Sequence, residues 1–451
     1  MTLVVDLKNE TIELLQHLIR NECVNDGTAA SGHEVRNADT IEAYLDGVGL
    51  DIERYEPTPG RVSLVSRIAG TDPSAPSLCL MGHTDVVPVN ESGWSREPFS
   101  GEIVTTDGIE EVWGRGAVDM LNLTSSMTVA FRHLAVSGFR PKGDLILFAV
   151  ADEESGSAHG MRWMADHERD AIAADYVLTE NGGLHTGSPD APSVGITIAE
   201  KGVAWRRIHI DGVPGHGSMP YRKHNALAKA AAIIQRLTEY APPARVSELW
   251  ATQVKAMELD PDTTGMLLDP DRIDEVLTAM PAATASYLHA CTHTTFSCNV
   301  LDGGLMKTNV IPDSVSIDVD IRTLPGDEAA EVAEHLRTAL GDELLDGVRV
   351  EPLMNDASSI SRTDNQLWDS IGAAVARPFP TASLSPRMVV GFTDARIYRE
   401  MGAIAFGAGL MSPTLDPGSF GSRFHGNDER IDTESLALTT RFWLDVVHGL
   451  Q

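Results

Sequence analysis

The sequence predicts an α/β fold in two domains: a larger domain with a mixed sheet covered by helices, and a small α/β sandwich inserted into it. The chain has 451 residues, more than one compact core usually holds. Apolar residues make up 42% of the sequence, which is enough to fill two cores. Strand-like runs alternate with helical patterns up to about residue 200, and the order of elements then changes.

The N-terminal part alternates amphipathic helices with short apolar strands. Apolar residues at helical spacing predict helices over 4–21, 34–48 and 121–137. Continuous apolar runs predict buried strands at 61–68, 78–81, 144–150 and 176–179. At the other end of the chain, the sequence predicts a strand at 404–407 and a terminal helix from about residue 433.

The middle of the chain has a different order of elements. Strands are predicted at 203–211, 314–322 and 347–352, and helices at 225–240 and 327–340. This order of strand, helix, strand, helix and strand predicts a separate small sandwich. We therefore expect one domain over 1–200 and 353–451, and an inserted domain over 201–352. Residues 241–290, with several prolines and acidic residues, predict an additional segment to which the sequence assigns no role.

A histidine or an acidic residue follows several apolar runs at the point where each run ends. These residues are His83, Asp119, Glu153, Glu154 and Glu180. One such placement means little, because an isolated His-x-Asp triplet or a run of acids is usually a turn or a solvated loop. Several of them on one edge of a sheet would concentrate negative charge that only metal ions could offset. His83 could bind such an ion while the carboxylate of Asp85 holds its other ring nitrogen.

These motifs resemble those of the M20 family of co-catalytic zinc metallohydrolases, which includes aminoacylases, glutamate-releasing carboxypeptidases, desuccinylases and dipeptidases. The resemblance extends over nearly the whole chain. It rests on the segments 82–85, 114–120, 152–154 and 215–218, and on Glu180, Asn309, Arg322 and His425. Leu121 departs from the family pattern, because many relatives have lysine there, but that position is not a metal ligand.

The resemblance implies two Zn²⁺ ions per chain, which Co²⁺ or Mn²⁺ could replace. Asp119 would bridge the two ions. His83 and Glu180 would complete one site, and Glu154 and His425 the other. Nitrogen and carboxylate ligands of this kind suit zinc.

The resemblance also assigns roles to residues around the metals. Glu153 would be the general base, His216 would stabilise the oxyanion, and Arg322 and Asn309 would grip a substrate carboxylate. From the residues alone, His216 is more simply a turn residue and Arg322 a surface charge. A cis peptide bond after Asp119 is also implied. The remaining histidines are assigned no role, among them His133, His159, His185, His209, His289 and His293.

The implied function is hydrolysis of an amide or peptide bond next to a free carboxylate, by a carboxypeptidase or an N-acyl-amino-acid amidohydrolase. Its substrate would be an N-acyl amino acid or a short peptide. Glu180 is typical of this branch, as are the segments 393–396 and 424–427. A dipeptidase or a succinyl-diaminopimelate desuccinylase-like enzyme is the alternative, and a metal-binding protein without activity is a more remote one. The absence of G-x-S-x-G and G-x-G-x-x-G disfavours serine hydrolases and dinucleotide enzymes.

The charge and the termini bear on partners and location. The formal net charge of −30 disfavours binding to nucleic acids or to anionic membranes. Because no signal-peptide pattern and no apolar run of about 20 residues is present, we expect a cytoplasmic protein. An inserted sandwich with an open edge predicts a homodimer. The resemblance adds that His216 serves the partner's active site, whereas in a monomer the inserted domain would provide the equivalent residue in cis.

Overall fold

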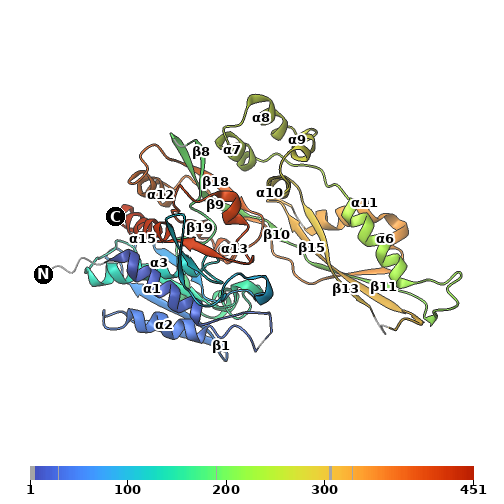
Figure 1. The fold of residues 1–451 in the computed structure, drawn as a ribbon, viewed down its shortest axis with the longest axis horizontal. Helices are drawn as coiled ribbons and strands as arrows, with labels where there is room; N and C mark the ends of the chain where they lie inside the picture. The colour runs from blue at the N-terminus through green and yellow to red at the C-terminus, as the bar shows by residue number, and fades with distance from the viewer. Residues whose placement is uncertain (1–5, 29, 189, 304–306, 328, 451) are drawn as a thin grey trace.

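The computed structural model describes the whole chain except residues 1–5, 29, 189, 304–306, 328 and 451. Two main β-sheets, each covered by helices, lie at opposite ends of the molecule (Figure 1). The predicted α/β class, with a mixed main sheet covered by helices, is confirmed.

The larger sheet carries the candidate site on one of its edges. Its strands follow the order β1 (Ile52–Thr58), β2 (Arg61–Ile68), β6 (Leu145–Val150), β3 (Leu78–His83), β7 (Tyr176–Thr179), β19 (Ile404–Gly407), β9 (Ala191–Glu200) and β17 (Ser359–Ile360). Two further strands, β8 (His185–Ser188) and β18 (Ser383–Val389), also pair with β9. The central strands β6, β3, β7 and β19 are parallel, and the flanking pairs β1–β2, β2–β6 and β19–β9 are antiparallel.

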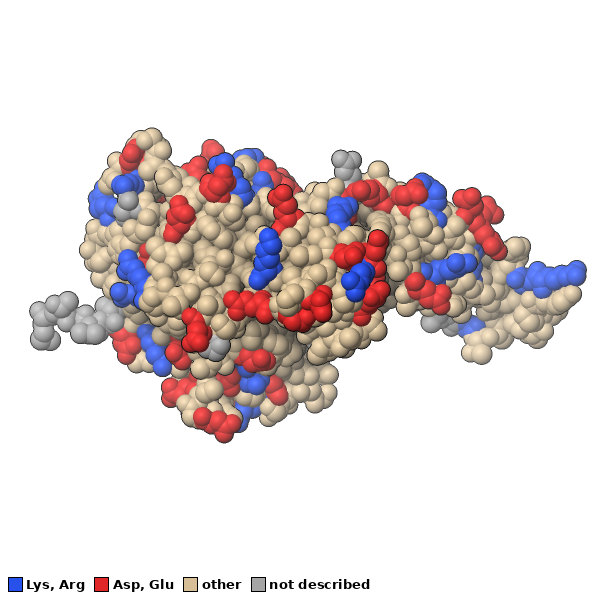
Figure 2. All heavy atoms as spheres, turned by 90° about the horizontal axis from the view of Figure 1, so that it is seen from above, with Lys and Arg blue, Asp and Glu red and all other residues tan. Residues whose placement is uncertain are grey.

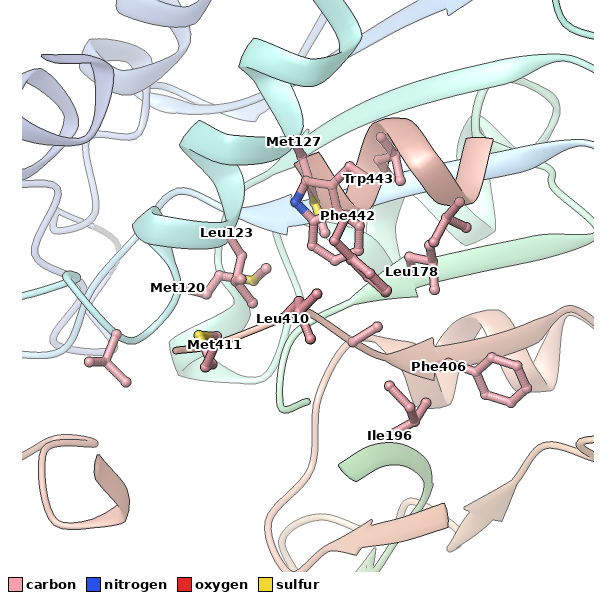
Figure 3. Close-up of a cluster of buried hydrophobic side chains, with 14 of the residues drawn as sticks. Met120, Leu123, Met127, Leu178, Ile196, Phe406, Leu410, Met411, Phe442 and Trp443 are labelled. Carbon is pink, nitrogen blue, oxygen red and sulfur yellow. The ribbon is translucent and has the colours of Figure 1, made fainter. Parts of the chain in front are cut away.

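Helices cover both faces of this sheet because its central strands are apolar on both sides. Along β3, Leu78 and Leu80 point into one cluster and Cys79 and Met81 into the other. The first cluster receives α1 (Leu7–Arg20), α2 (Val35–Leu45), α3 (Leu121–Val136), α12 (Gln366–Ala376) and α15 (Thr433–Gly449). Figure 3 shows its centre, where α3 and α15 meet around Met127 and Trp443. The second cluster receives α4 (Met161–His167), α5 (Arg169–Ile172) and α13 (Ala395–Glu400).

The second sheet has a hydrophobic cluster of its own. Its strands are β10 (Gly202–Val203), β15 (Ser314–Thr323), β11 (Arg206–Asp211), β16 (Val348–Pro352) and β13 (Thr295–Gly303), all antiparallel. Residues of β15 alternate between buried and half-buried, as the pattern predicts. The buried face packs against α6 (Ala226–Glu239) and the kinked helix α11 (Ala329–Leu345). The predicted strand over 203–211 is interrupted at residues 204–205, so that β10 and β11 are separate.

Residues 241–290, the additional segment without an assigned role, are largely helical. They form α7 (Glu248–Ala256), α8 (Pro261–Leu267), α9 (Ile273–Ala279) and α10 (Ala282–Thr292). Their buried side chains belong to the cluster of the larger sheet, and Trp250 Nε1 donates a hydrogen bond to the carbonyl of Leu267 at 2.7 Å. These helices thus pack towards the larger sheet, although in the sequence they fall between β11 and β13, two strands of the smaller sheet.

The remaining elements are short. They are β4 (Ile103–Thr106), β5 (Ile109–Trp113), β12 (Gly215–His216), β14 (Val310–Ile311), β20 (Arg430–Asp432), α14 (Pro417–Gly421) and two 3-10 turns at Glu91–Gly93 and Glu153–Ser155. Acidic side chains, with basic ones between them, are scattered over the face shown in Figure 2. Among the described residues, no helix is both long and apolar enough to span a bilayer.

Candidate metal centre

Parallel strands bring four of the predicted site residues to one edge of the larger sheet. His83 is the last residue of β3, Glu153 and Glu154 follow β6, and Glu180 follows β7. Because β6, β3 and β7 are parallel neighbours, their carboxyl ends lie side by side. The four side chains therefore converge, as the sequence pattern predicts.

The carboxylate of Asp119 lies between two imidazoles. Its Oδ1 is 3.2 Å from Nε2 of His83, and its Oδ2 is 3.2 Å from Nε2 of His425. Nε2 of His425 also lies 3.2 Å from Oε2 of Glu154. The peptide bond between Asp119 and Met120 is cis, as the resemblance implies.

The ligand atoms fall into two overlapping groups, each with its atoms within 4.8 Å of one another. One group is His83, Glu153 and Glu180, and the other is His83, Asp119 and Glu154. His83 belongs to both groups. The Asp119 carboxylate belongs to one of them, but its two oxygens face different imidazoles, those of His83 and His425, as a carboxylate between paired ions would.

Burial and crowding disfavour negative charge on the carboxyl groups at this edge. Burial, together with the charge of Glu180, raises the pKa of Glu153 well above its usual range. Burial and the charge of Asp119 raise the pKa of Glu154 to about 7. The Oε1 atom of Glu154 is buried and has no hydrogen-bond partner among the described residues. Imidazole nitrogens and carboxylate oxygens are ligands that suit divalent ions such as Zn²⁺. The unpaired Oε1 of Glu154 is free to bind one.

Asp85 holds the neighbouring loop rather than the imidazole. Its carboxylate lies 3.6 Å from Nδ1 of His83, too far for a hydrogen bond, and Nδ1 instead pairs with the backbone carbonyl of Asp85 at 2.9 Å. The carboxylate accepts the backbone N–H groups of Glu153 and Glu154 at 3.2 and 3.1 Å. The predicted role of the Asp85 carboxylate in orienting His83 stays a prediction. The turn after β3 brings the carbonyl to the ring, which frees the side chain to fix the two glutamates.

Glu429 is a buried residue of the site that the sequence did not reveal. Its Oε1 accepts the backbone N–H groups of Gly116, Val118 and Asp119 at 3.1, 2.7 and 3.0 Å. Its Oε2 accepts a hydrogen bond from Arg115 at 2.7 Å. This carboxylate fixes the turn that carries Asp119. The only signal in the sequence is that it lies four residues after a predicted ligand.

Arg322 lies where the second sheet meets the larger one. Its guanidinium pairs with Asp320 at 2.7 Å and stacks on Phe392, with Cζ 5.0 Å from the ring centroid. Its Nη1 is buried and has no hydrogen-bond partner among the described residues. Phe392 leads directly to Asp394, which accepts a hydrogen bond from Ser157 just beyond the two glutamates. Arg322 is thus connected to the candidate metal centre through this loop.

His216 and Asn309 lie together, but away from Arg322. β12 pairs with β14, and the Gly217 N–H donates to the carbonyl of Asn309 at 2.8 Å. Both side chains are exposed. The connection between β11 and α6, which carries His216, lies at the end of the molecule away from the larger sheet (Figure 1). Ser314 and Arg322 lie towards opposite ends of β15, roughly 26 Å apart at about 3.3 Å per residue. Within one chain, the structure does not bring Asn309 to Arg322.

Comparison with known proteins agrees with this geometry. Residues 79–449 match the model of Peptidase family M20/M25/M40. A probable carboxypeptidase S-like 2 of Dictyostelium discoideum is 25% identical over 407 residues, which cover 86% of this chain and 74% of the relative. Aminoacylase-1 of Sus scrofa is 28% identical over 401 residues, which cover 87% of this chain and 84% of the relative.

A solved structure has the same fold. The M20 family metallo-carboxypeptidase Sso-CP2 from Sulfolobus solfataricus superposes with a TM-score of 0.72 at 16% identity, covering 98% of this chain and 99% of that one. The fold and the site therefore define a metal-dependent hydrolase of amide bonds. The chain belongs to Peptidase family M20/M25/M40.

We predict that Glu429→Ala destabilises the protein and lowers its metal content. The substitution leaves Arg115 buried without its partner and releases three backbone N–H groups, a loss of about 3–5 kcal/mol in the free energy of unfolding. Denaturant unfolding and metal analysis would measure both effects. Exposed Glu91→Ala is the control and should change stability by less than about 0.5 kcal/mol. Unchanged stability and metal content in Glu429→Ala would contradict the role of this carboxylate.

Proposed function

We propose that this chain hydrolyses an amide or peptide bond next to a free carboxylate, using two Zn²⁺ ions. The observation that carries the proposal is the Asp119 carboxylate, with one oxygen facing His83 and the other facing His425. An N-acyl amino acid or a short peptide is the substrate class that this arrangement favours. Cleavage of such compounds by the zinc-loaded protein, with loss of activity after chelation, is the direct test.

The residues divide into two ligand sets that share Asp119. His83 and Glu180 belong to one set, and Glu154 and His425 to the other, in agreement with the contact between His425 and Glu154. When bound, the ions would polarise the substrate carbonyl and make the attacking water more acidic. Glu429 and Asp85 keep the ligand-bearing turns in place through their backbone hydrogen bonds.

Glu153 is the proposed general base. It is buried and lies in a ligand group with His83 and Glu180, and its raised pKa suits a carboxyl group that first takes a proton and then gives it up. It would take the proton from the attacking water at a carboxylate oxygen and pass it to the nitrogen of the leaving amine. Backbone hydrogen bonds to Asp85 orient Glu153 and Glu154 separately, so that one carboxylate can face the substrate while the other binds an ion.

Arg322 is the proposed partner of the substrate carboxylate. Its unpaired, buried Nη1 supports this role, because a guanidinium can bind a carboxylate through two parallel hydrogen bonds. The stacked ring of Phe392 limits the movement of the guanidinium.

His216 and Asn309 are proposed to act on the active site of a partner chain. They lie together at the separate β12–β14 pair, so one chain would present both to its neighbour. In this proposal residues 201–352 form the lid and dimerisation domain, and residues 1–200 and 353–451 form the catalytic domain. The helices α7–α10, which pack towards the larger sheet, would hold the lid to it.

We predict that Glu153→Gln and Glu154→Gln separate proton transfer from metal binding. Glu153→Gln should keep its metal content and lower kcat by about 10²–10⁴-fold, because only the base is lost. Glu154→Gln, its matched control, should lose bound metal. Metal analysis and steady-state kinetics measure the two effects. Loss of metal from Glu153→Gln, with retention in Glu154→Gln, would mean that the two roles are exchanged.

We predict that Arg322→Lys weakens recognition of the substrate carboxylate. Lysine keeps the charge but cannot form two parallel hydrogen bonds, so kcat/KM should fall by at least about tenfold, with the metal content unchanged. The wild-type protein should cleave free acids much faster than the corresponding amides, and Arg322→Lys should reduce this preference. Equal cleavage of acids and amides by the wild type would remove Arg322 from this role.

We predict that inactive His216→Ala and inactive Glu153→Gln restore activity when their subunits exchange. In a mixed dimer, one active site would hold an intact Glu153 and receive an intact His216 from the other chain. About half of the wild-type activity per mixed dimer should return. Mixing His216→Ala with Asn309→Ala is the control and should restore nothing, because one chain presents both residues. No recovery after verified exchange, or a monomer by sedimentation, would contradict action in trans.

A further inference from the structure

A second group of metal-ligand side chains lies outside the candidate metal centre. Asp274 is in the first turn of α9, His289 is in the last turn of α10, and His293 directly follows α10. One potential ligand atom of each lies within 4.8 Å of the others. Figure 1 shows α9 and α10 near the junction of the two sheets.

His293 has a buried ring nitrogen that forms no hydrogen bond with the described part of the chain. Its side chain is 1% exposed, and its Nδ1 lies 3.1 Å from the carbonyl of His289. That carbonyl can only accept, so a proton on Nδ1 makes this contact and leaves the lone pair on Nε2. The Thr292 hydroxyl also lies 3.0 Å from Nδ1, and its own proton can go to the carbonyl of Leu288 or His289. Nε2 has no hydrogen-bond partner among the described residues and lies 3.6 Å from Oδ1 of Asp274. A backbone carbonyl that fixes the tautomer in this way is typical of metal-binding histidines.

His289 and Asp274 complete the group from the solvent side. Positions i and i+4 lie on the same side of a helix, and the rings of His289 and His293 stack with centroids 4.0 Å apart and planes 3° apart. The side chain of Asp274 is 63% exposed, which leaves a route from solvent. Two ligands at about 2.0–2.1 Å from a tetrahedral ion are roughly 3.3 Å apart. Because an imidazole nitrogen binds an ion in the plane of its ring, the half-buried His289 ring would turn out of this stack to share an ion with His293.

We propose that Asp274, His289 and His293 bind one divalent ion of the zinc class, separately from the candidate metal centre. Two imidazole nitrogens and a carboxylate oxygen suit Zn²⁺, with water as the fourth ligand. The ion would join α9 to the end of α10. The next element is β13, and Nζ of Lys201 binds the carbonyls of Ala290 and His293 at the same place. The site would therefore stabilise the junction between the two sheets.

The test compares zinc content between variants of the full-length protein after dialysis against one zinc buffer. Asp274→Asn and His289→Gln replace side chains that are not fully buried, and the double variant should hold one zinc per chain fewer than the wild type. His209→Gln is the control, because His209 also faces a carboxylate, Glu351, at 2.6 Å. Its zinc content should equal that of the wild type. Since the result is a difference, it does not depend on how many ions the candidate metal centre holds.

A second measurement separates this site from a general effect on folding. Each single variant should weaken zinc binding at this site by at least about tenfold, while amide hydrolysis and the far-UV circular dichroism spectrum stay unchanged. The rise in Tm caused by added zinc should be smaller in the double variant than in the wild type. Equal zinc content in the wild type and the double variant, or an equal loss in His209→Gln, would overturn the proposal.

Discussion

The buried carboxylate of Asp119, held between the imidazoles of His83 and His425, is the contact on which the rest of the larger sheet depends. Burying it beside Glu153, Glu154 and Glu180 is unfavourable unless cations offset the charge. The topology of the sheet places these carboxyl groups close together. Its parallel strands β6, β3 and β7 end side by side, so residues that follow them meet at one edge.

A second set of carboxylates fixes the backbone around the first. Glu429 binds three backbone N–H groups of the turn that ends at Asp119, and Asp85 binds those of Glu153 and Glu154. The carboxylates of Glu429 and Asp85 therefore accept hydrogen bonds from the same backbone N–H groups that they hold in place. The arrangement explains why the ligand-bearing loops can be irregular and still hold their side chains within a few ångströms of one another.

Sequence patterns predicted what depends on local periodicity and on strand ends. The alternation in β15 and the positions of His83 and Glu180 after apolar strands are of this kind. Contacts between distant segments could not be predicted: Glu429 reaches a turn some 310 residues away, and nothing in its spacing indicates that. The helices α7–α10 were missed because proline and acidic residues obscure their short apolar patterns. The distance between Arg322 and Asn309 could not be predicted either, because it depends on how β15 runs through the second sheet.

The larger sheet gathers the proposed ligands, the smaller sheet carries Arg322 near the junction, and the separate β12–β14 pair carries His216. The central claim is that two ions share Asp119. Anomalous diffraction at the zinc edge, from crystals of the zinc-loaded protein, tests it most directly. The account predicts two peaks flanking the Asp119 carboxylate, one beside His83 and the other beside His425. A single peak there, or zinc peaks only elsewhere in the chain, would contradict it.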